Sequence, residues 1–201
     1  RIHFMHKIRS LHAKKPKVIM DFGCGTGGNI KYLLNVFKPE KLIAADISSK
    51  SLEIVSKKFE KSVVEVKKIE TNSEQQTSYC DMVYCNGVFH HIPLSDRKMA
   101  MNYIFSSLKE GGSFFFWENN PWNLGTHWVM SRIPFDKNAI KIFPRTAKGM
   151  MESNGFDIQQ VRFLFIFPRF LKYLRFLEIL FVKIPLGAQY LVFAKKNNGS
   201  Q

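Results

Sequence analysis

Short apolar runs alternate with amphipathic runs along the first part of the chain. The apolar runs have strand length and are rich in β-branched or aromatic residues; they cover 18–22, 42–45, 63–69, 82–85 and 113–117. The segments between them carry apolar side chains at the spacing of one helix face, in 29–37, 51–59 and 97–108. Strands that alternate with helices predict an α/β fold, in which a mainly parallel sheet has helices on both faces.

The first predicted strand ends in an acid and a glycine-rich turn. Residues 18–27 read Val-Ile-Met-Asp-Phe-Gly-Cys-Gly-Thr-Gly. Glycine lacks a Cβ and tolerates positive φ, so such a turn lets a ligand approach the backbone, and the following helix aims free N–H groups at it. The turn therefore predicts a nucleotide site. Because Gly23, Gly25 and Gly28 also satisfy the dinucleotide pattern, a nicotinamide site remains an alternative.

A second acid closes the second predicted strand. Residues 41–46 read Lys-Leu-Ile-Ala-Ala-Asp, and Asp46 follows Gly23 by 23 residues, about where an acid holds ribose hydroxyls. Ligands of such sheets bind at the carboxyl ends of the strands, so we expect Asp21, Asp46, Asn86 and Glu118 on one rim. The structural alternatives are an ordinary strand–helix turn and a helix N-terminal acid.

The motifs together resemble those of a class I S-adenosylmethionine-dependent methyltransferase. The resemblance rests on residues 18–27, on Asp46 and on Cys80-Asp-Met-Val-Tyr-Cys-Asn-Gly-Val-Phe-His-His-Ile92, and it covers about 17–118. Residues 189–195 are similar to the last strand of the family. The resemblance implies one Rossmann-like, doubly wound domain over 1–201, with a mostly parallel seven-stranded sheet. Insertions would lie at 119–145, on the acceptor side, and at 167–185, before the last strand.

The resemblance also implies S-adenosylmethionine as the cofactor and names the residues that bind it. Asp21 would orient the glycine loop and approach the methionine end, and Asp46 would bind the ribose. Asn86 and Gly87 would line the methyl-donor pocket, and either Glu70 or Asn72 would contact adenine. The complete expected set is Asp21, Gly23, Cys24, Gly25, Thr26, Gly27, Asp46, Ile47, Glu70, Asn72, Asn86 and Gly87.

The segment after the fifth strand is expected to select the methyl acceptor. Residues 118–128 combine two tryptophans with amide and carboxylate groups, and the Glu-Asn-Asn-Pro-Trp-Asn run resembles a bacterial small-molecule branch of the family. We predict acceptor contacts for Glu118, Asn119, Trp122 and Trp128; a capped loop with the tryptophans in the core is the alternative.

Histidines are the candidates for a catalytic base. Methyl transfer depends mainly on alignment of acceptor and donor, so a base is optional. A hydroxyl acceptor could lose its proton to His90, His91 or His127; for His90 and His91 structural capping is the alternative. The three cysteines have no metal-ligand spacing, so we expect no metal site.

The net charge of the chain and an amphipathic segment near its end indicate which partners the protein binds. The 30 Lys and Arg residues against 16 Asp and Glu give a net charge of +14, which indicates an anionic partner or surface. On a helix over 169–183, one apolar face would gather Phe170, Tyr173, Leu174, Leu177, Leu180 and Phe181. Such a basic, aromatic helix is typical of an anionic membrane surface, a substrate lid or a subunit contact; packing on the protein's own sheet is the alternative. We expect a cytoplasmic protein, peripheral on the inner face of a membrane.

The sequence thus predicts a methyltransferase that acts at oxygen or nitrogen of a small acceptor, lipophilic or membrane-proximal. An RNA-modifying methyltransferase is one alternative, although nucleic acid is the less favoured partner because no RNA-binding module is visible. A non-catalytic S-adenosylmethionine-binding scaffold or activator subunit and a nicotinamide-dependent reductase are the others. The oligomeric state stays open.

Overall fold

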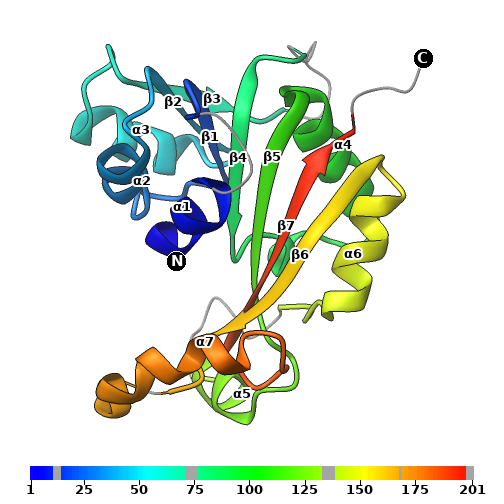
Figure 1. Cartoon of the computed structure of the whole chain (residues 1–201). Coiled ribbons are helices and arrows are strands. Elements are labelled where there is room, and N and C mark those ends of the chain that lie inside the picture. The colour runs from blue at the N-terminus through cyan, green and yellow to red at the C-terminus, as the bar shows by residue number, and fades with distance from the viewer. Residues whose placement is uncertain (11–14, 71–76, 133–138, 168, 198–201) are drawn as a thin grey trace.

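A seven-stranded sheet forms the centre of the protein (Figure 1). The computed structural model describes residues 1–10, 15–70, 77–132, 139–167 and 169–197. The sheet order is β3-β2-β1-β4-β5-β7-β6, with β1 to β5 parallel and β7 antiparallel to both of its neighbours. The strands are β1 (Val18–Phe22), β2 (Lys41–Asp46), β3 (Val64–Lys68), β4 (Cys80–Asn86), β5 (Leu108–Asn119), β6 (Phe156–Leu164) and β7 (Gln189–Lys196).

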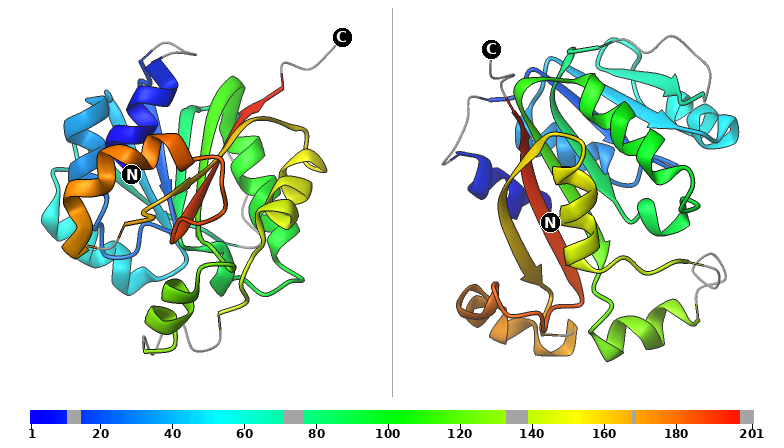
Figure 2. Two further views of the ribbon diagram at one scale, coloured as in Figure 1. Left: turned by 60° about the horizontal axis from the view of Figure 1, so that its bottom comes forward. Right: turned by 90° about the vertical axis from the view of Figure 1, so that its right-hand side faces the viewer.

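Helices cover both faces of the sheet, as the two views of Figure 2 show. One face carries α1 (Ile2–Ser10), α2 (Ile30–Phe37) and α3 (Ser49–Lys58); the other carries α4 (Arg97–Ser107) and α6 (Pro144–Glu152). The remaining helical segments are η1 (Phe89–His91), α5 (Leu124–Met130), η3 (Arg169–Leu177) and α7 (Glu178–Phe181). This doubly wound α/β architecture confirms the predicted fold class.

Alternation along β5 explains why the molecule has a core on each face. Successive side chains of a strand point to opposite faces of the sheet. Phe114 and Phe116 therefore join the core that packs against α4 and α6, whereas Phe115 and Trp117 join the core under α1, α2 and α3. All four rings are fully buried, and each such burial contributes about 1.5–3 kcal/mol. The strand is thereby fixed from both sides, and its carboxyl end is a rigid platform.

The predicted continuous helix over 169–183 is wrong. The segment forms the 3₁₀ helix η3, with non-helical φ/ψ at Leu171, followed by the single turn α7. Hydrogen bonds tie it to β6 and to the residues that follow β6: the Phe163 N–H donates to the Val182 carbonyl at 2.6 Å, and the Phe167 N–H donates to the Glu178 carboxylate at 3.0 Å. The 3₁₀ geometry and the non-helical residue Leu171 therefore replace the single α-helix that the periodicity predicts.

Candidate functional site: a glycine turn and a cavity at the sheet rim

The glycine turn after β1 is held against β2 by main-chain hydrogen bonds. The N–H groups of Gly23 and Cys24 both donate to the Ala45 carbonyl, at 2.8 and 3.1 Å. Gly23, Gly25 and Gly27 have φ of 71°, 51° and 82°, a region that side chains rarely adopt. The sequence therefore places glycine where the backbone requires it.

The three glycines face different surroundings. A Cβ at Gly23 would lie 2.4 Å from a methyl carbon of Val88, and one at Gly27 would lie 3.0 Å from the Phe59 ring, so both glycines serve close packing. A Cβ at Gly25 would meet nothing within 4 Å among the atoms of the described chain. Gly25 is thus the glycine of the turn that borders open space, where a ligand can approach the backbone.

Asp46 fastens the same turn from the end of β2. One of its carboxylate oxygens accepts from the Gly25 N–H and the other from the Ser48 N–H, each at 2.8 Å. A carboxylate has about four acceptor positions, so both oxygens keep capacity for a ribose hydroxyl. The next side chain, Ile47, is 75% exposed and offers an apolar surface to a planar base. The cofactor residues assigned to this turn therefore lie together.

Asp21 and Asn86 present buried polar atoms at the ends of β1 and β4. Within the described part of the chain, Asp21 Oδ2 and Asn86 Oδ1 are buried and have no hydrogen-bond partner. Burial, and then the charge of Asp46, raise the pKa of the Asp21 carboxyl to about 7. A buried acceptor without a partner is costly, and a cationic or donor-bearing ligand removes that cost. The ammonium group at the amino acid end of S-adenosylmethionine is a donor that would fit these two oxygens.

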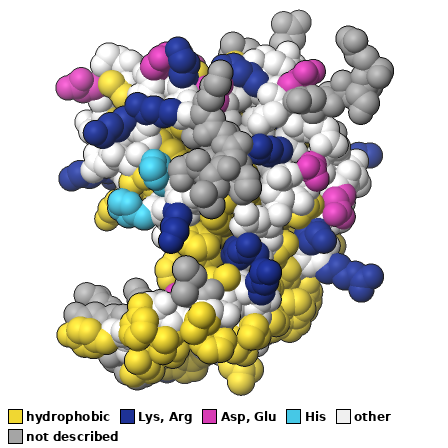
Figure 3. Space-filling model, in the orientation of Figure 1, with side chains coloured by type: hydrophobic (Ala, Val, Ile, Leu, Met, Phe, Trp, Pro, Cys, Tyr) yellow, Lys and Arg dark blue, Asp and Glu magenta, His cyan; other side chains and the backbone are white. Residues whose placement is uncertain are grey.

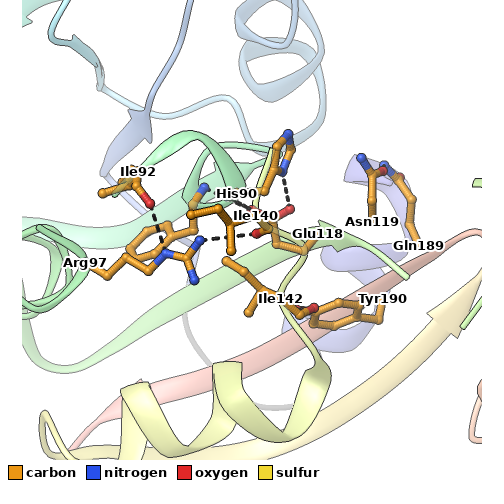
Figure 4. Close-up of polar contacts among 10 residues, drawn as sticks. His90, Ile92, Arg97, Glu118, Asn119, Ile140, Ile142, Gln189 and Tyr190 are labelled. Atoms are coloured by element: carbon orange, nitrogen blue, oxygen red, sulfur yellow. Dashed lines mark hydrogen bonds and ion pairs between the residues drawn. The ribbon is translucent and has the colours of Figure 1, made fainter. Parts of the chain in front are cut away.

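Glu118 lies beneath this rim and binds η1 (Figure 4). Its carboxylate accepts from the N–H groups of Phe89 and His90, at 2.9 and 3.4 Å, and lies 2.5 Å from Nδ1 of the His90 ring. Glu118 is 1% exposed and His90 is 4% exposed. His90 stands beside the end of β4, because a Cβ at Gly87 would lie 3.5 Å from its Cε1. Glu118 therefore orients the His90 ring.

A cavity of about 1000 Å³ opens next to the glycine turn, between α1, α2, α5 and the ends of β5 and β7. Figure 3 shows the corresponding hollow between the upper body and the lower lobe. Its apolar lining includes Tyr32, Trp128, Met130 and Phe165, and its polar lining includes Asn119, Asn123, Thr126 and Gln189. Two of the four predicted acceptor residues, Asn119 and Trp128, therefore line it.

Four polar side chains of this cavity are bonded to its wall, and Arg1, His3 and Asn29 also line it. Gln189 donates to the Asn119 side chain at 3.1 Å, and Thr126 Oγ1 donates to the Ala188 carbonyl at 2.8 Å. Asn123 accepts from the Thr126 N–H at 2.9 Å and donates to the Leu186 carbonyl at 2.8 Å. These groups shape the cavity, and much of the remaining contact surface is aromatic or aliphatic.

Other predicted site residues lie apart from the cavity or outside the described residues. Trp122 packs near the rings of Phe143 and Phe163, at centroid distances of 5.7 and 6.3 Å, and does not line the cavity. Glu70 is exposed and pairs with Lys68 at 3.3 Å. His91 is exposed, and its ring centroid lies 4.1 Å from that of His90. Asn72 and the side chain of His127 lie outside the described residues.

Sequence reasoning missed part of the cavity wall. Tyr32, Phe165 and Gln189 come from three distant segments, and no local motif joins them. One signal was available for Tyr32, because it lies three residues after Asn29 and so shares a helix face with the end of the glycine turn.

Comparison with known proteins agrees with this geometry. A family model described as a methyltransferase domain matches residues 19–112. A malonyl-[acyl-carrier protein] O-methyltransferase of Acetivibrio thermocellus is 29% identical over 106 residues, which are 53% of this chain and 37% of that protein. The chain thus spans little more than a third of that relative's length.

Solved structures share the fold over nearly the whole chain. A SAM-dependent methyltransferase from Archaeoglobus fulgidus superposes with a TM-score of 0.70 at 18% identity, covering 98% of this chain and 95% of the other. One from Mesorhizobium loti gives a TM-score of 0.68 at 15% identity, covering 97% and 98%.

The similarity to a methyltransferase domain thus covers just under half of the chain, and the solved structures share its fold. The glycine turn, Asp46 and 80–92, which carry the resemblance, all lie within the matched residues. The antiparallel β7 also separates the sheet from the dinucleotide-binding fold, whose sixth strand follows the fifth in a mostly parallel order.

Proposed function

We propose that the chain transfers the methyl group of S-adenosylmethionine to an oxygen or nitrogen atom of a small, largely apolar acceptor. The observation that carries the proposal is the cavity beside the glycine turn. Asn119, Asn123, Thr126 and Gln189 bond within the wall, and the lining also includes Trp128, Met130 and Phe165. Recognition there would rest on apolar contact, with few polar groups to fix orientation.

Each residue of the rim would contact a different part of the cofactor. Asp46 would accept from the ribose, Ile47 would cover the base, and Asp21 with Asn86 would face the charged amino acid end. When bound, S-adenosylmethionine supplies a methyl group whose bond to sulfur breaks as an acceptor lone pair attacks, with the bonding pair left on sulfur. The chain's contribution is to hold the acceptor in line and to exclude water.

His90 is the candidate base for a hydroxyl acceptor. Its Nδ1 lies 2.5 Å from the Glu118 carboxylate, and a Cβ at Gly87 would lie 3.5 Å from its Cε1, so the ring is oriented at the end of β4. In this arrangement the carboxylate would hold the imidazole ring in one orientation. For an acceptor that loses its proton to water, the pair would serve only to shape the end of β4.

Labelled cofactor tests the proposal whatever the acceptor is. Incubation with S-adenosylmethionine labelled at the methyl group, together with fractionated lipid and metabolite extracts, should transfer label to an organic-soluble product. Label in an RNA fraction alone would point instead to RNA modification. Donor binding without transfer to any fraction would favour a non-catalytic scaffold.

Two tryptophans of one segment provide a matched pair for the acceptor side. Trp128 lines the cavity and Trp122 does not, although the two are 58% and 51% exposed. Trp128→Ala should raise the acceptor KM and leave donor affinity unchanged. Trp122→Ala is the control and should leave the acceptor KM near the wild-type value. Equal effects of the two variants would contradict the assignment of the cavity to the acceptor.

A further inference from the structure

An apolar lobe projects below the sheet, made of α5 and residues 171–186 (Figures 1 and 3). The two parts adjoin, because the Asn123 side chain donates to the Leu186 carbonyl at 2.8 Å. Tyr173, Phe176 and Leu180 are 77%, 72% and 70% exposed, and Leu124 is 84% exposed. Monomeric soluble domains rarely leave so many neighbouring large apolar side chains in water, so this surface calls for an occupant.

Hydrogen bonds anchor the lobe to the rest of the protein, so its side chains are exposed on a fixed backbone. The carboxylate of Glu178 accepts from the N–H groups of Phe165 and Phe167, at 3.3 and 3.0 Å. The side-chain amide of Asn120, which is fully buried, donates to the carbonyls of Pro185 and Gly187, at 3.0 and 2.7 Å. These bonds clamp the lobe to the ends of β5 and β6 while its apolar side chains face outward.

Basic residues outnumber acidic ones in the later part of this lobe. Residues 167–186 contain four Lys and Arg against one Glu. Arg132, Arg145 and Lys183 are exposed, and the Arg132 guanidinium lies 3.7 Å from the centroid of the Trp128 ring. In Figure 3 the acidic side chains lie mainly on the upper body.

We infer that the apolar lobe docks on the surface of an anionic lipid bilayer. Exposed aromatic and aliphatic side chains would enter the boundary between headgroups and acyl chains, and the surrounding cations would meet anionic headgroups. Within the described residues no helix is both long and apolar enough to cross a membrane, so the contact proposed is a surface one. A second copy of this chain would present the same positive charge and is therefore the less suited occupant.

Vesicle sedimentation tests the inference independently of any methyl transfer. The full chain should sediment with phosphatidylcholine vesicles that contain phosphatidylserine and stay in solution with phosphatidylcholine alone. Raising the salt from 0.1 M to 1 M shortens the screening length from about 10 Å to about 3 Å and should release most of the protein. Equal binding to neutral and anionic vesicles would overturn the electrostatic part of the inference, and binding to neither would overturn all of it.

Lobe variants locate the contact. Tyr173→Ser, Phe176→Ser and Leu180→Ser combined should weaken vesicle binding at least about tenfold, because each side chain loses apolar burial in the bilayer. Ile54→Ser, Val66→Ser and Met99→Ser combined are the control; these side chains are 40%, 39% and 45% exposed on α3, β3 and α4, outside the lobe. Equal losses in the two combinations would contradict the assignment.

A charge variant keeps the test valid if the triple lobe variant fails to fold. Lys183→Gln should weaken binding to anionic vesicles about fivefold, and Lys183→Arg should restore it. Unchanged binding of Lys183→Gln, together with no salt dependence of the wild type, would overturn the inference. Sedimentation velocity that shows a wild-type dimer and a monomeric triple variant, with no lipid binding, would assign the lobe to self-association instead.

Discussion

Substitution of the three glycines by alanine should separate ligand approach from packing in the turn after β1. Gly25 has φ of 51° and open space beyond its Cα, so Gly25→Ala strains the backbone and fills the space offered to the cofactor. The left-handed conformation costs an alanine about 1–2 kcal/mol. For a domain of this size that cost corresponds to a Tm lower by about 2–8 °C.

Gly25→Ala should also weaken cofactor binding, for a reason separate from its effect on stability. A methyl group in the approach path displaces the ligand from the backbone, and we expect S-adenosylhomocysteine to bind at least about tenfold more weakly, or about 1.4 kcal/mol. Titration calorimetry measures the affinity, and scanning calorimetry measures the Tm of the same samples.

The neighbouring glycines provide the controls. A Cβ at Gly28 would also meet nothing within 4 Å, but its φ is not in the left-handed region, so Gly28→Ala should change neither affinity nor Tm appreciably. A Cβ at Gly23 would collide with Val88, so Gly23→Ala should lower the Tm through overpacking that costs about 1–3 kcal/mol. Wild-type affinity in Gly25→Ala would refute this reasoning, and so would an equal loss in Gly28→Ala.

Two further predictions concern buried carboxyl groups. The folded pKa of Asp21 is about 7, above the unfolded value of 3.8, so the folded chain holds a proton there that the unfolded chain releases. The stability of the ligand-free protein should therefore fall as pH rises from about 4 to about 7, by at most about 4 kcal/mol from this group. Denaturant unfolding across that range should show a smaller fall in Asp21→Asn; an identical fall would exclude Asp21 as its source. Glu118→Gln keeps the acceptor for Phe89 but loses the charge beside His90, so its Tm should drop by about 2–6 °C, and an unchanged Tm would mean that the pair contributes no stability.

The rim of the site was predictable because parallel strands obey a simple rule. Each strand of a parallel sheet ends at the same edge, so Asp21, Asp46 and Asn86 had to lie near one another once the strands were located. The glycine turn was equally predictable, since positive φ at Gly25 restricts the residue type.

The acceptor side was less predictable because it depends on contacts between distant segments. Trp122 and Trp128 are only six residues apart in the sequence, but α5 begins between them, and the two side chains lie in different surroundings. The sequence predicts Glu118 on the rim of the sheet, but in the structure its side chain is buried and binds η1. Periodicity over 169–183 predicts an apolar face, but it does not predict the 3₁₀ geometry, the kink at Leu171 or the hydrogen bonds to β6.

Binding of S-adenosylmethionine to wild type and Asp46→Ala by titration calorimetry tests the central claim most directly. Asp46 accepts from the Gly25 N–H and would accept from the ribose, so the substitution removes about 1.5–3 kcal/mol of hydrogen bonding to a charged group. We predict one site on the wild type, binding roughly tenfold to hundredfold weaker in Asp46→Ala, and no competition by nicotinamide dinucleotides. Unchanged affinity in the variant, or tighter binding of a nicotinamide dinucleotide, would contradict the account.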